Sequence, residues 1–326
     1  MTISLLLLMG GFIVLTAGGH YLVEGSVRIA LLARISSAVV GLTVVAMGTS
    51  MPELAVSLGA AARGATDISY GNVVGSNIFN IAAILALTAI IKAVPVERQT
   101  VRLEYPFMVL ASWIMLLLSR DGLMDRLEGA FFLFSLVAFV AYAVRLARQD
   151  VSVKEAAEIA RQVDEVVGDK ATQAWGRNVG LIALGIVGLV IGSELMVRGA
   201  VTIARDFGIT ERVIGLTIVA MGTSLPELAT SIVAARRNES AIALGNVIGS
   251  NIFNVLAILG ATSVLIPVPV NPIAISVDNW VMLAFTVALF PMMWLGKRVT
   301  RRDGIVLLAG FLAYMIYLLV PQGGGG

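Results

Sequence analysis

The sequence predicts an all-α polytopic membrane protein, with ten transmembrane helices forming two inverted five-helix repeats with broken core helices. Three observations lead to this fold class. The 326 residues are 58% hydrophobic and 13% charged, with a mean hydropathy of +0.92, whereas soluble domains average about 45–50% apolar and about 25% charged residues. The apolar residues gather in ten runs of membrane-spanning length. One long segment also occurs twice.

Each run is bounded by charges or by glycine and proline, and each is near the roughly 20 residues that a membrane helix needs. The first has no basic region before it and exceeds the length of a signal-peptide core, so we expect a retained helix. In order, the runs are about 2–30, 37–62, 68–91, 103–119, 127–144, 179–204, 211–235, 241–266, 277–296 and 304–320.

A polar stretch at 145–177 separates the runs into two groups of five. Its mixed charge, with Ala, Ile and Val at near-helical spacing, is typical of a solvated connector helix. A regulatory site is the open alternative, although the stretch is too short for a folded ligand-binding domain. We therefore expect a first half at 1–144, the connector, a second half at 178–322 and a tail at 323–326.

The basic residues are distributed unevenly across the predicted membrane. Of the 23 Lys and Arg residues, 17 fall on the connector side, five on the other side and one, Arg198, within a span. The positive-inside rule then places the connector in the cytoplasm and both termini outside a cell membrane. The net charge of +2 gives no reason to expect nucleic acid, and the sequence identifies no partner besides the lipid bilayer and ions.

The internal repeat has two parts at one offset of 174 residues. Residues 39–57 reappear at 213–231 with fifteen of nineteen positions identical, and residues 71–80 reappear at 245–254 with one difference, Val74 against Ile248. Five spans separate equivalent positions, so the copies enter the membrane in opposite orientations. Inverted repeats with interrupted helices are a recurrent design of secondary transporters.

The first repeated segment places helix-breaking and cation-binding groups inside an apolar span. Pro52 has no N–H, so the carbonyl of Gly48 loses its helical partner. Such groups are tolerated at membrane depth only when protein, water or an ion completes them. Thr49 and Ser50 precede Glu53 by four and three residues, which predicts two hydroxyls and a carboxylate on one helical face. The other candidate ligands are Ser76, Asn80, Thr223, Ser224, Glu227, Ser250 and Asn254.

All these candidates offer oxygen, which favours a hard cation such as Ca²⁺ with its about 6–8 oxygen ligands. The chain has no cysteine and one histidine, so the motifs offer no ligand typical of transition metals. Glu53 and Glu227 neutralise one divalent ion, and a mid-span glutamate is a functional candidate because burying its charge is costly. The alternative, a protonated or Arg-paired glutamate that ties helices together, is disfavoured because neither motif contains a basic residue.

Ser, Thr and Asn also hydrogen-bond between membrane helices, and Gly75 and Gly249 permit close packing. Four of the repeated side chains are assigned to ion binding, because they recur together with the glutamates: Ser76, Asn80, Ser250 and Asn254. Helix packing and ligation both stay open for Asn72, Asn77, Asn246 and Asn251.

Gly-Thr-Ser-x-Pro-Glu at 48–53 and 222–227, each followed by Gly-Asn-Val-x-Gly-Ser-Asn-Ile-Phe-Asn, resembles the two alpha-repeats of the cation/calcium exchanger superfamily, here at about 39–80 and 213–254. The best match is the prokaryotic sodium/calcium exchanger branch. The resemblance covers nearly the whole chain and implies ten helices, no permanent cofactor, and antiport of Na⁺ against Ca²⁺ by alternating access. It also implies that the long first and sixth helices slide across the other eight.

The ligand set that the resemblance implies includes both glutamates. Its other members are Thr49, Ser50, Thr223 and Ser224, the side chains of Ser76, Asn80 and Ser250, and the backbone oxygens of Ala46 and Ala220.

The sequence departs from the family pattern at two places. Asn254 stands where potassium-dependent members have Asp, which argues against K⁺ dependence. His20 stands where relatives often have an acid, and we expect an interfacial or hydrogen-bonded residue there rather than a proton sensor. At the equivalent place in the second half, Glu194 is expected to pair with Arg198 as a structural ion pair.

Two other functions stay open. A proton/calcium antiporter of the same superfamily is disfavoured because its usual motif has Gly-Asn-Ala in place of Gly-Thr-Ser. A cation channel is a second alternative because inverted repeats also build pores. An enzyme is not expected, since the sequence lacks paired membrane aspartates, a Ser/His dyad and an HExxH zinc motif.

Overall fold

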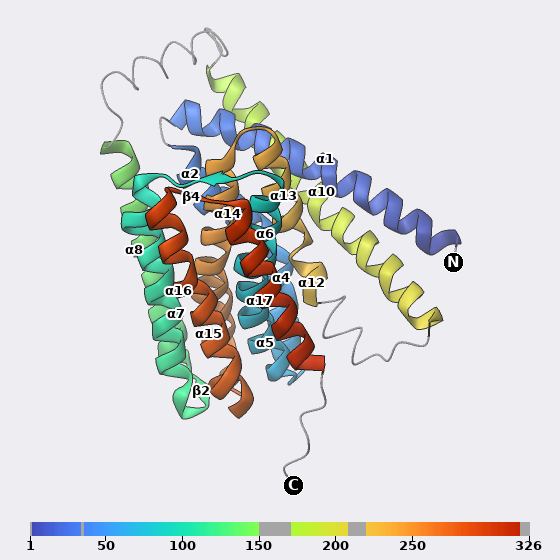
Figure 1. Cartoon of the computed structure of the whole chain (residues 1–326), viewed down its shortest axis with the longest axis vertical. Coiled ribbons are helices and arrows are strands. Elements are labelled where there is room, and N and C mark those ends of the chain that lie inside the picture. The colour runs from blue at the N-terminus through green and yellow to red at the C-terminus, as the bar shows by residue number, and fades with distance from the viewer. Residues whose placement is uncertain (1, 34–35, 150–170, 208–219, 320–326) are drawn as a thin grey trace.

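The computed structural model describes residues 2–33, 36–149, 171–207 and 220–319, and nearly all of them are helical (Figure 1). Elements labelled η are π-helices, except η4, which is a 3₁₀ turn. The elements before the connector are α1 (Thr2–Ala33), α2 (Ser37–Val40), η1 (Gly41–Val45), α3 (Ala46–Thr49), α4 (Met51–Ala62), α5 (Thr66–Phe79), η2 (Asn80–Leu85), α6 (Ala86–Ile91), β1 (Val94–Pro95), η3 (Thr100–Glu104), α7 (Tyr105–Leu118), η4 (Ser119–Asp121), β2 (Leu123–Met124) and α8 (Arg126–Gln149).

The second half has a closely similar series of elements. They are α10 (Ala171–Asp206), α12 (Ala220–Thr223), α13 (Leu225–Arg236), α14 (Ser240–Phe253), η6 (Asn254–Leu259), α15 (Gly260–Leu265), β3 (Val268–Pro269), η7 (Ala274–Asp278), α16 (Asn279–Gly296), β4 (Arg298–Val299) and α17 (Arg301–Leu319).

Within the described residues, seven helical stretches are long and apolar enough to cross a membrane. An eighth is added if 38–49 and 51–62, which meet at a 43° bend, form one span. The all-helical, multi-pass prediction is therefore confirmed, while the number ten stays a prediction. Of the two remaining predicted runs, the described part of 304–320 lies in α17, and the described part of 211–235 forms α12 and α13.

The predicted end of the first span was wrong. It extends to Ala33 rather than residue 30, because its apolar pattern continues through the charges near its end. Within the predicted connector, 145–177, α8 continues to Gln149 and α10 begins at Ala171, and the bounds of the connector stay a prediction. The predicted connector helix falls mainly on residues 150–170, which lie outside the described residues, as does the tail at 323–326.

Helices α1 and α10 lie side by side and run obliquely to the remaining bundle (Figure 1). Glycines allow their backbones to approach closely. A Cβ atom on Gly18 would lie 2.6 Å from the backbone nitrogen of Leu189, and one on Gly185 would lie 2.5 Å from that of Leu22. Larger side chains at these positions would separate the two helices, so the small residues fix this pair.

The two most buried spans are 66–91 and 240–265, which form the centre of the bundle. Each changes from α-helix to π-helix at an asparagine, Asn80 in the first and Asn254 in the second. A π-bulge adds one residue to a turn and is frequent at functional sites. The two repeated asparagines therefore occupy equivalent, irregular positions in the core.

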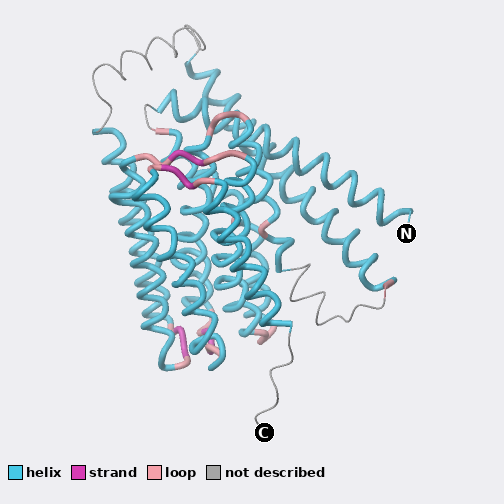
Figure 2. Tube along the Cα trace, in the orientation of Figure 1, coloured by secondary structure: helices cyan, strands magenta, loops and turns pink. Residues whose placement is uncertain are grey.

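Two short antiparallel ribbons connect the loops at opposite ends of the bundle (Figure 2). Strand β1 pairs with β4 through Val94 and Val299, and β2 pairs with β3 through Leu123 and Pro269. Each ribbon joins a loop of the first half to a loop of the second. The ribbons thus hold the two halves together at both ends.

Candidate cation-binding site

Both glutamate-bearing segments contain a helix break three residues before the glutamate. Ser50 separates α3 from α4 with φ −83° and ψ 8°, and Ser224 separates α12 from α13 with φ −91° and ψ 9°. A proline lies in the first turn of each following helix, where its missing N–H costs no helical hydrogen bond. The breaks place each serine between two helices and each glutamate in the first turn of the helix that follows.

Glu53 and Glu227 are both buried, each residue being 1% exposed. Ser50 donates from Oγ to Oε1 of Glu227 at 2.9 Å, and Ser224 donates from Oγ to Oε1 of Glu53 at 2.8 Å. The expectation that Ser50 shares a helical face with Glu53 was wrong, because the helix breaks at Ser50 and its hydroxyl reaches the other repeat. Each carboxylate is therefore oriented by a serine from the opposite half.

The second oxygen of each carboxylate, Oε2, is buried without a hydrogen-bond partner among the described residues. The Oδ1 atoms of Asn80 and Asn254, each 1% exposed, are in the same state. Carboxylate and amide oxygens of this kind can only accept, and unpaired acceptors are costly in an apolar interior. A bound cation stabilises such a set, and all four atoms belong to residues that the sequence predicts as ligands.

The remaining predicted ligands lie close to this pair or beside its helix breaks. Ser250 donates to Oε1 of Glu227 at 3.5 Å. The hydroxyls of Ser224 and Ser76 are 3.4 Å apart. Thr223 is 8% exposed, and Ala220 begins α12.

Thr49 and the backbone oxygen of Ala46, which precede the helix break at Ser50, already have hydrogen-bond partners in the protein. Thr49 Oγ1 lies 3.3 Å from the carbonyl oxygen of Ala46 and 3.2 Å from Oδ1 of Asn246. The Ala46 oxygen also accepts from the backbone N–H of Ser50 at 3.0 Å. A carbonyl oxygen has two lone pairs, so these contacts leave Ala46 able to accept a cation only in exchange for one of them.

Asn72 and Asn246 are not among the candidate ligands, but each forms hydrogen bonds to a glutamate-bearing segment. Asn72 Nδ2 lies 3.1 Å from the carbonyl oxygen of Glu53 and 2.9 Å from Oγ of Ser57. Asn246 repeats these contacts with Glu227 at 3.3 Å and Ser231 at 3.1 Å. The sequence left their role open, although one signal was present, because both lie nineteen residues after a glutamate.

Asn77 and Asn254 connect the two central spans. Asn254 donates from Nδ2 to Oδ1 of Asn77 at 3.0 Å. Nδ2 of Asn254 is occupied by this contact, whereas its Oδ1 atom has no hydrogen-bond partner among the described residues and can accept from an ion. Asn77 therefore acts in packing and in orienting a predicted ligand, which sequence alone did not distinguish.

The only histidine of the chain lies outside this site. The side chain of His20 is 53% exposed, and its Nε2 atom is 3.6 Å from Glu24, which also contacts Arg28 at 2.7 Å. The expected Glu194–Arg198 pair is present at 2.6 Å, with both side chains more than half exposed. A surface pair of this kind contributes little to stability.

One buried acid was missed by the sequence analysis. Glu104, the last residue of η3, is 0% exposed and neither carboxylate oxygen has a hydrogen-bond partner in the described structure. The equivalent residue 174 positions later, Asp278, ends η7 and accepts from the hydroxyl of Tyr314 at 2.8 Å. Neither residue belongs to the repeated motifs, so the motif search had no signal for them.

Within the described residues, no group of three or more His, Cys, Asp or Glu side chains could hold a metal ion. The candidate site therefore offers two carboxylates, those of Glu53 and Glu227, beside neutral oxygens. This composition fits a hard cation and lacks the soft ligands of a transition-metal site.

Comparison with known proteins agrees with this geometry. The model of the sodium/calcium exchanger protein family matches residues 3–145 and 177–320. The chain belongs to the sodium/calcium exchanger family. Its membership confirms the resemblance seen in the repeated motifs, and it makes the protein a multi-pass cation/Ca²⁺ exchanger of the membrane.

Individual relatives match over nearly their whole length. CaxA of Alkalimonas amylolytica is 39% identical over 324 residues, which cover 98% of this chain and 99% of the relative. The sodium/calcium exchanger MaX1 of Methanosarcina acetivorans is 30% identical, covering 97% and 99%. A solved structure of the sodium-calcium exchanger NCX_Mj superimposes with a TM-score of 0.84 at 31% identity, covering 97% of this chain and 99% of that one. MaX1 and NCX_Mj are named as exchangers rather than as enzymes.

Proposed function

We propose that this exchanger moves Ca²⁺ in one direction and Na⁺ in the other by alternating access, with net charge movement and without K⁺. The observation that carries the proposal is the crossed pair of serine–glutamate hydrogen bonds around Glu53 and Glu227, together with four buried acceptor oxygens that have no hydrogen-bond partner in the part of the chain that the structure describes. Two carboxylates balance one Ca²⁺, and the neutral oxygens complete its coordination.

The proposed ligands are those that the sequence predicts. The carboxylates of Glu53 and Glu227 and the amide oxygens of Asn80 and Asn254 have geometric support from their unpartnered atoms. The proposed set also includes the backbone oxygens of Ala46 and Ala220, and at Ala46 the ion replaces one of the two contacts that this oxygen accepts. The hydroxyl ligands are Thr49, Ser50, Thr223, Ser224, Ser76 and Ser250.

The proposed architecture has ten membrane helices in two inverted halves, 1–144 and 178–322. Support comes from the two ribbons, because β1 and β3 are equivalent strands 174 residues apart and lie at opposite ends of the bundle. Both termini lie outside the cell membrane and the connector lies in the cytoplasm. Helices α1 and α10, packed through glycines, slide together across the other helices and expose the site to each side in turn.

Neutral Asn254 supports K⁺ independence, because a third carboxylate would be needed to balance an additional cation in a medium of low dielectric constant. A proton/calcium antiporter is the second candidate, since the same two glutamates could bind protons in place of Na⁺. A channel is a weaker candidate, because the two candidate site glutamates are buried at 1% exposure rather than lining an open path.

Calcium uptake into proteoliposomes separates these functions. Vesicles containing the purified protein are loaded with Na⁺, with K⁺ or with an acidic buffer and diluted into a Ca²⁺ solution. We expect saturable uptake only with internal Na⁺. Uptake driven by the pH gradient alone would support the proton antiporter, and uptake that needs no counter-ion would support the channel.

A further inference from the structure

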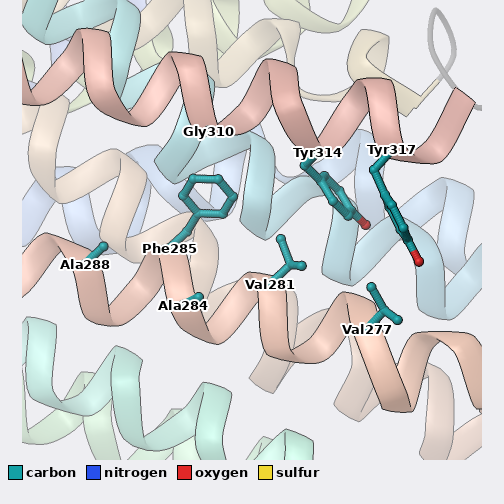
Figure 3. Close-up of a pocket in the computed structure, with 8 residues that line it drawn as sticks. All are labelled: Val277, Val281, Ala284, Phe285, Ala288, Gly310, Tyr314 and Tyr317. Atoms are coloured by element: carbon teal, nitrogen blue, oxygen red, sulfur yellow. The ribbon is translucent and has the colours of Figure 1, made fainter. Parts of the chain in front are cut away.

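A groove of about 490 Å³ lies between α16 and α17 on the outside of the bundle (Figure 3). Its lining is almost entirely carbon. Small residues create it, because Ala284 and Ala288 lie one turn apart on α16 and face Gly310 on α17. A Cβ atom on Gly310 would come within 3.0 Å of the Phe285 ring, so glycine keeps this part of the groove open.

The length of the groove matches one leaflet of a bilayer. It extends from Ala288 on α16 to Val277 in η7, eleven residues apart, which at about 1.5 Å per residue is roughly 16 Å. Half of the hydrocarbon core of a bilayer is about 15 Å. A neighbouring helix of a second copy would follow the full span, whereas this groove ends near its middle. One acyl chain fits that depth.

The end of the groove at Val277 is polar and lies on the side of the bundle opposite the connector (Figures 1 and 3). The hydroxyls of Tyr314 and Tyr317 point toward this end. Tyr314 donates to Oδ1 of Asp278 at 2.8 Å. Tyrosines are enriched where a membrane meets water, so this end lies at headgroup level.

The charge at this end selects among headgroups. Asp278 is half-buried and forms no ion pair with a basic side chain among the described residues. Its carboxylate attracts an ammonium group and repels a headgroup with net negative charge. The hydroxyl of Tyr317 can donate to the phosphate of the same lipid, because the proton of Tyr314 is already donated to Asp278.

We propose that this groove binds one acyl chain of a phospholipid with a primary-amine headgroup, taken from the leaflet opposite the connector, with the ammonium group beside Asp278. This site is separate from the cation site and does not depend on which ions the protein exchanges.

Native mass spectrometry of the full chain tests the proposal. The protein is reconstituted with equal amounts of phosphatidylethanolamine and phosphatidylglycerol, transferred to a mild detergent and analysed for bound lipid. We expect one retained phosphatidylethanolamine, favoured at least about fivefold over phosphatidylglycerol. Retention of no lipid, or equal retention of both, overturns the proposal.

Variants locate the binding. Ala284→Leu combined with Ala288→Leu fills the groove and should remove the bound lipid. Ala309→Leu, at an exposed position of α17 that does not line the groove, should retain it. Ala284→Leu alone replaces the double variant if size exclusion or thermal unfolding shows that the latter is misfolded. Asp278→Asn keeps an acceptor for Tyr314 and should abolish the headgroup preference. Lipid retained by the filled groove, or a preference unchanged in Asp278→Asn, overturns the assignment.

Discussion

Ser50 and Glu227 lie 177 residues apart in the sequence, and a 2.9 Å hydrogen bond joins them at the centre of the molecule. Ser224 and Glu53 form the equivalent contact at 2.8 Å. Neither half of the chain can complete its own carboxylate environment, because the orienting hydroxyl comes from the other half. The candidate site therefore lies at the interface of the two repeats.

The first prediction concerns charge at the site. Glu53→Gln or Glu227→Gln should abolish Ca²⁺ exchange, because each removes half of the charge that balances a divalent ion in an environment where imbalance is costly. Counter-ion-dependent Ca²⁺ uptake into proteoliposomes measures the effect. Glu194→Gln is the matched control, since Glu194 is more than half exposed on α10 and should exchange normally. Near wild-type uptake by either site variant would remove that glutamate from the ligand set.

The second prediction concerns the crossed hydrogen bonds. Ser50→Ala and Ser224→Ala should each raise the half-saturating Ca²⁺ concentration by roughly tenfold or more, since a hydrogen bond to a charged group contributes about 1.5–3 kcal/mol. Uptake rates over a Ca²⁺ series give the half-saturating concentration. Ser135→Ala, at an exposed site on α8 where the hydroxyl bonds to its own helix, is the control. Two unchanged Ca²⁺ curves would show that the serines neither bind the ion nor orient the carboxylates.

The third prediction assigns positioning roles to Asn72 and Asn246. Replacing either by Ala removes the donor that holds the backbone of a glutamate, so Ca²⁺ half-saturation should rise by about tenfold with a smaller change in maximal rate. Asn251→Ala is the control, because this buried asparagine in the same helix as Asn246 donates to its own helix at Val247. If Asn251→Ala has an equal effect, the change reports general helix packing instead.

Composition and repetition were sufficient to predict the helical membrane fold, since burial in lipid leaves few alternatives to long apolar helices. The repeated Glu53 and Glu227 could likewise be found as unusual charges in apolar spans. The sequence could not show whether each serine hydroxyl contacts the glutamate of its own repeat or that of the other repeat. A continuous helix places Ser50 beside Glu53, but the break at Ser50 turns its side chain toward Glu227, and that depends on packing between distant segments.

The role of Asn72 illustrates a second limit. Its sequence context is equally consistent with packing and with ion binding, because an amide can both donate and accept. Only the observed donation to the carbonyl oxygen of Glu53 separates these roles. Glu104 was missed for another reason, because it lies near the start of a span where a charged residue is expected at the surface, yet it is fully buried.

The fourth prediction concerns membrane orientation. The 17-to-5 distribution of basic residues places the connector in the cytoplasm, so a cysteine at Ala171 should resist an impermeant thiol reagent added to intact cells. A cysteine replacing Asp121, at the opposite end, should react. The native chain has no cysteine, which gives a clean background. Labelling of the Ala171 variant from outside would reverse the proposed topology.

The fifth prediction is that exchange moves net charge. Glu53 and Glu227 provide two negative charges, which one Ca²⁺ cancels, while the duplicated neutral oxygens can coordinate more than two monovalent ions. With three Na⁺ per Ca²⁺, as the family resemblance implies, the sodium-loaded carrier has one more positive charge than the calcium-loaded carrier. Each cycle then responds to the membrane potential by about 2.3 kcal/mol per 100 mV.

Valinomycin and a K⁺ gradient impose that potential on proteoliposomes. An interior-positive potential should accelerate Ca²⁺ uptake that is driven by internal Na⁺, because it favours the outward movement of the additional charge, and an interior-negative potential should slow it. Because Asn80 and Asn254 add no charge to the site, replacing K⁺ by choline with no potential imposed should leave the rate unchanged. Flux that is indifferent to voltage would indicate exchange of two Na⁺ for one Ca²⁺, and a requirement for K⁺ would show that the two glutamates are not the only carboxylates balancing the ions.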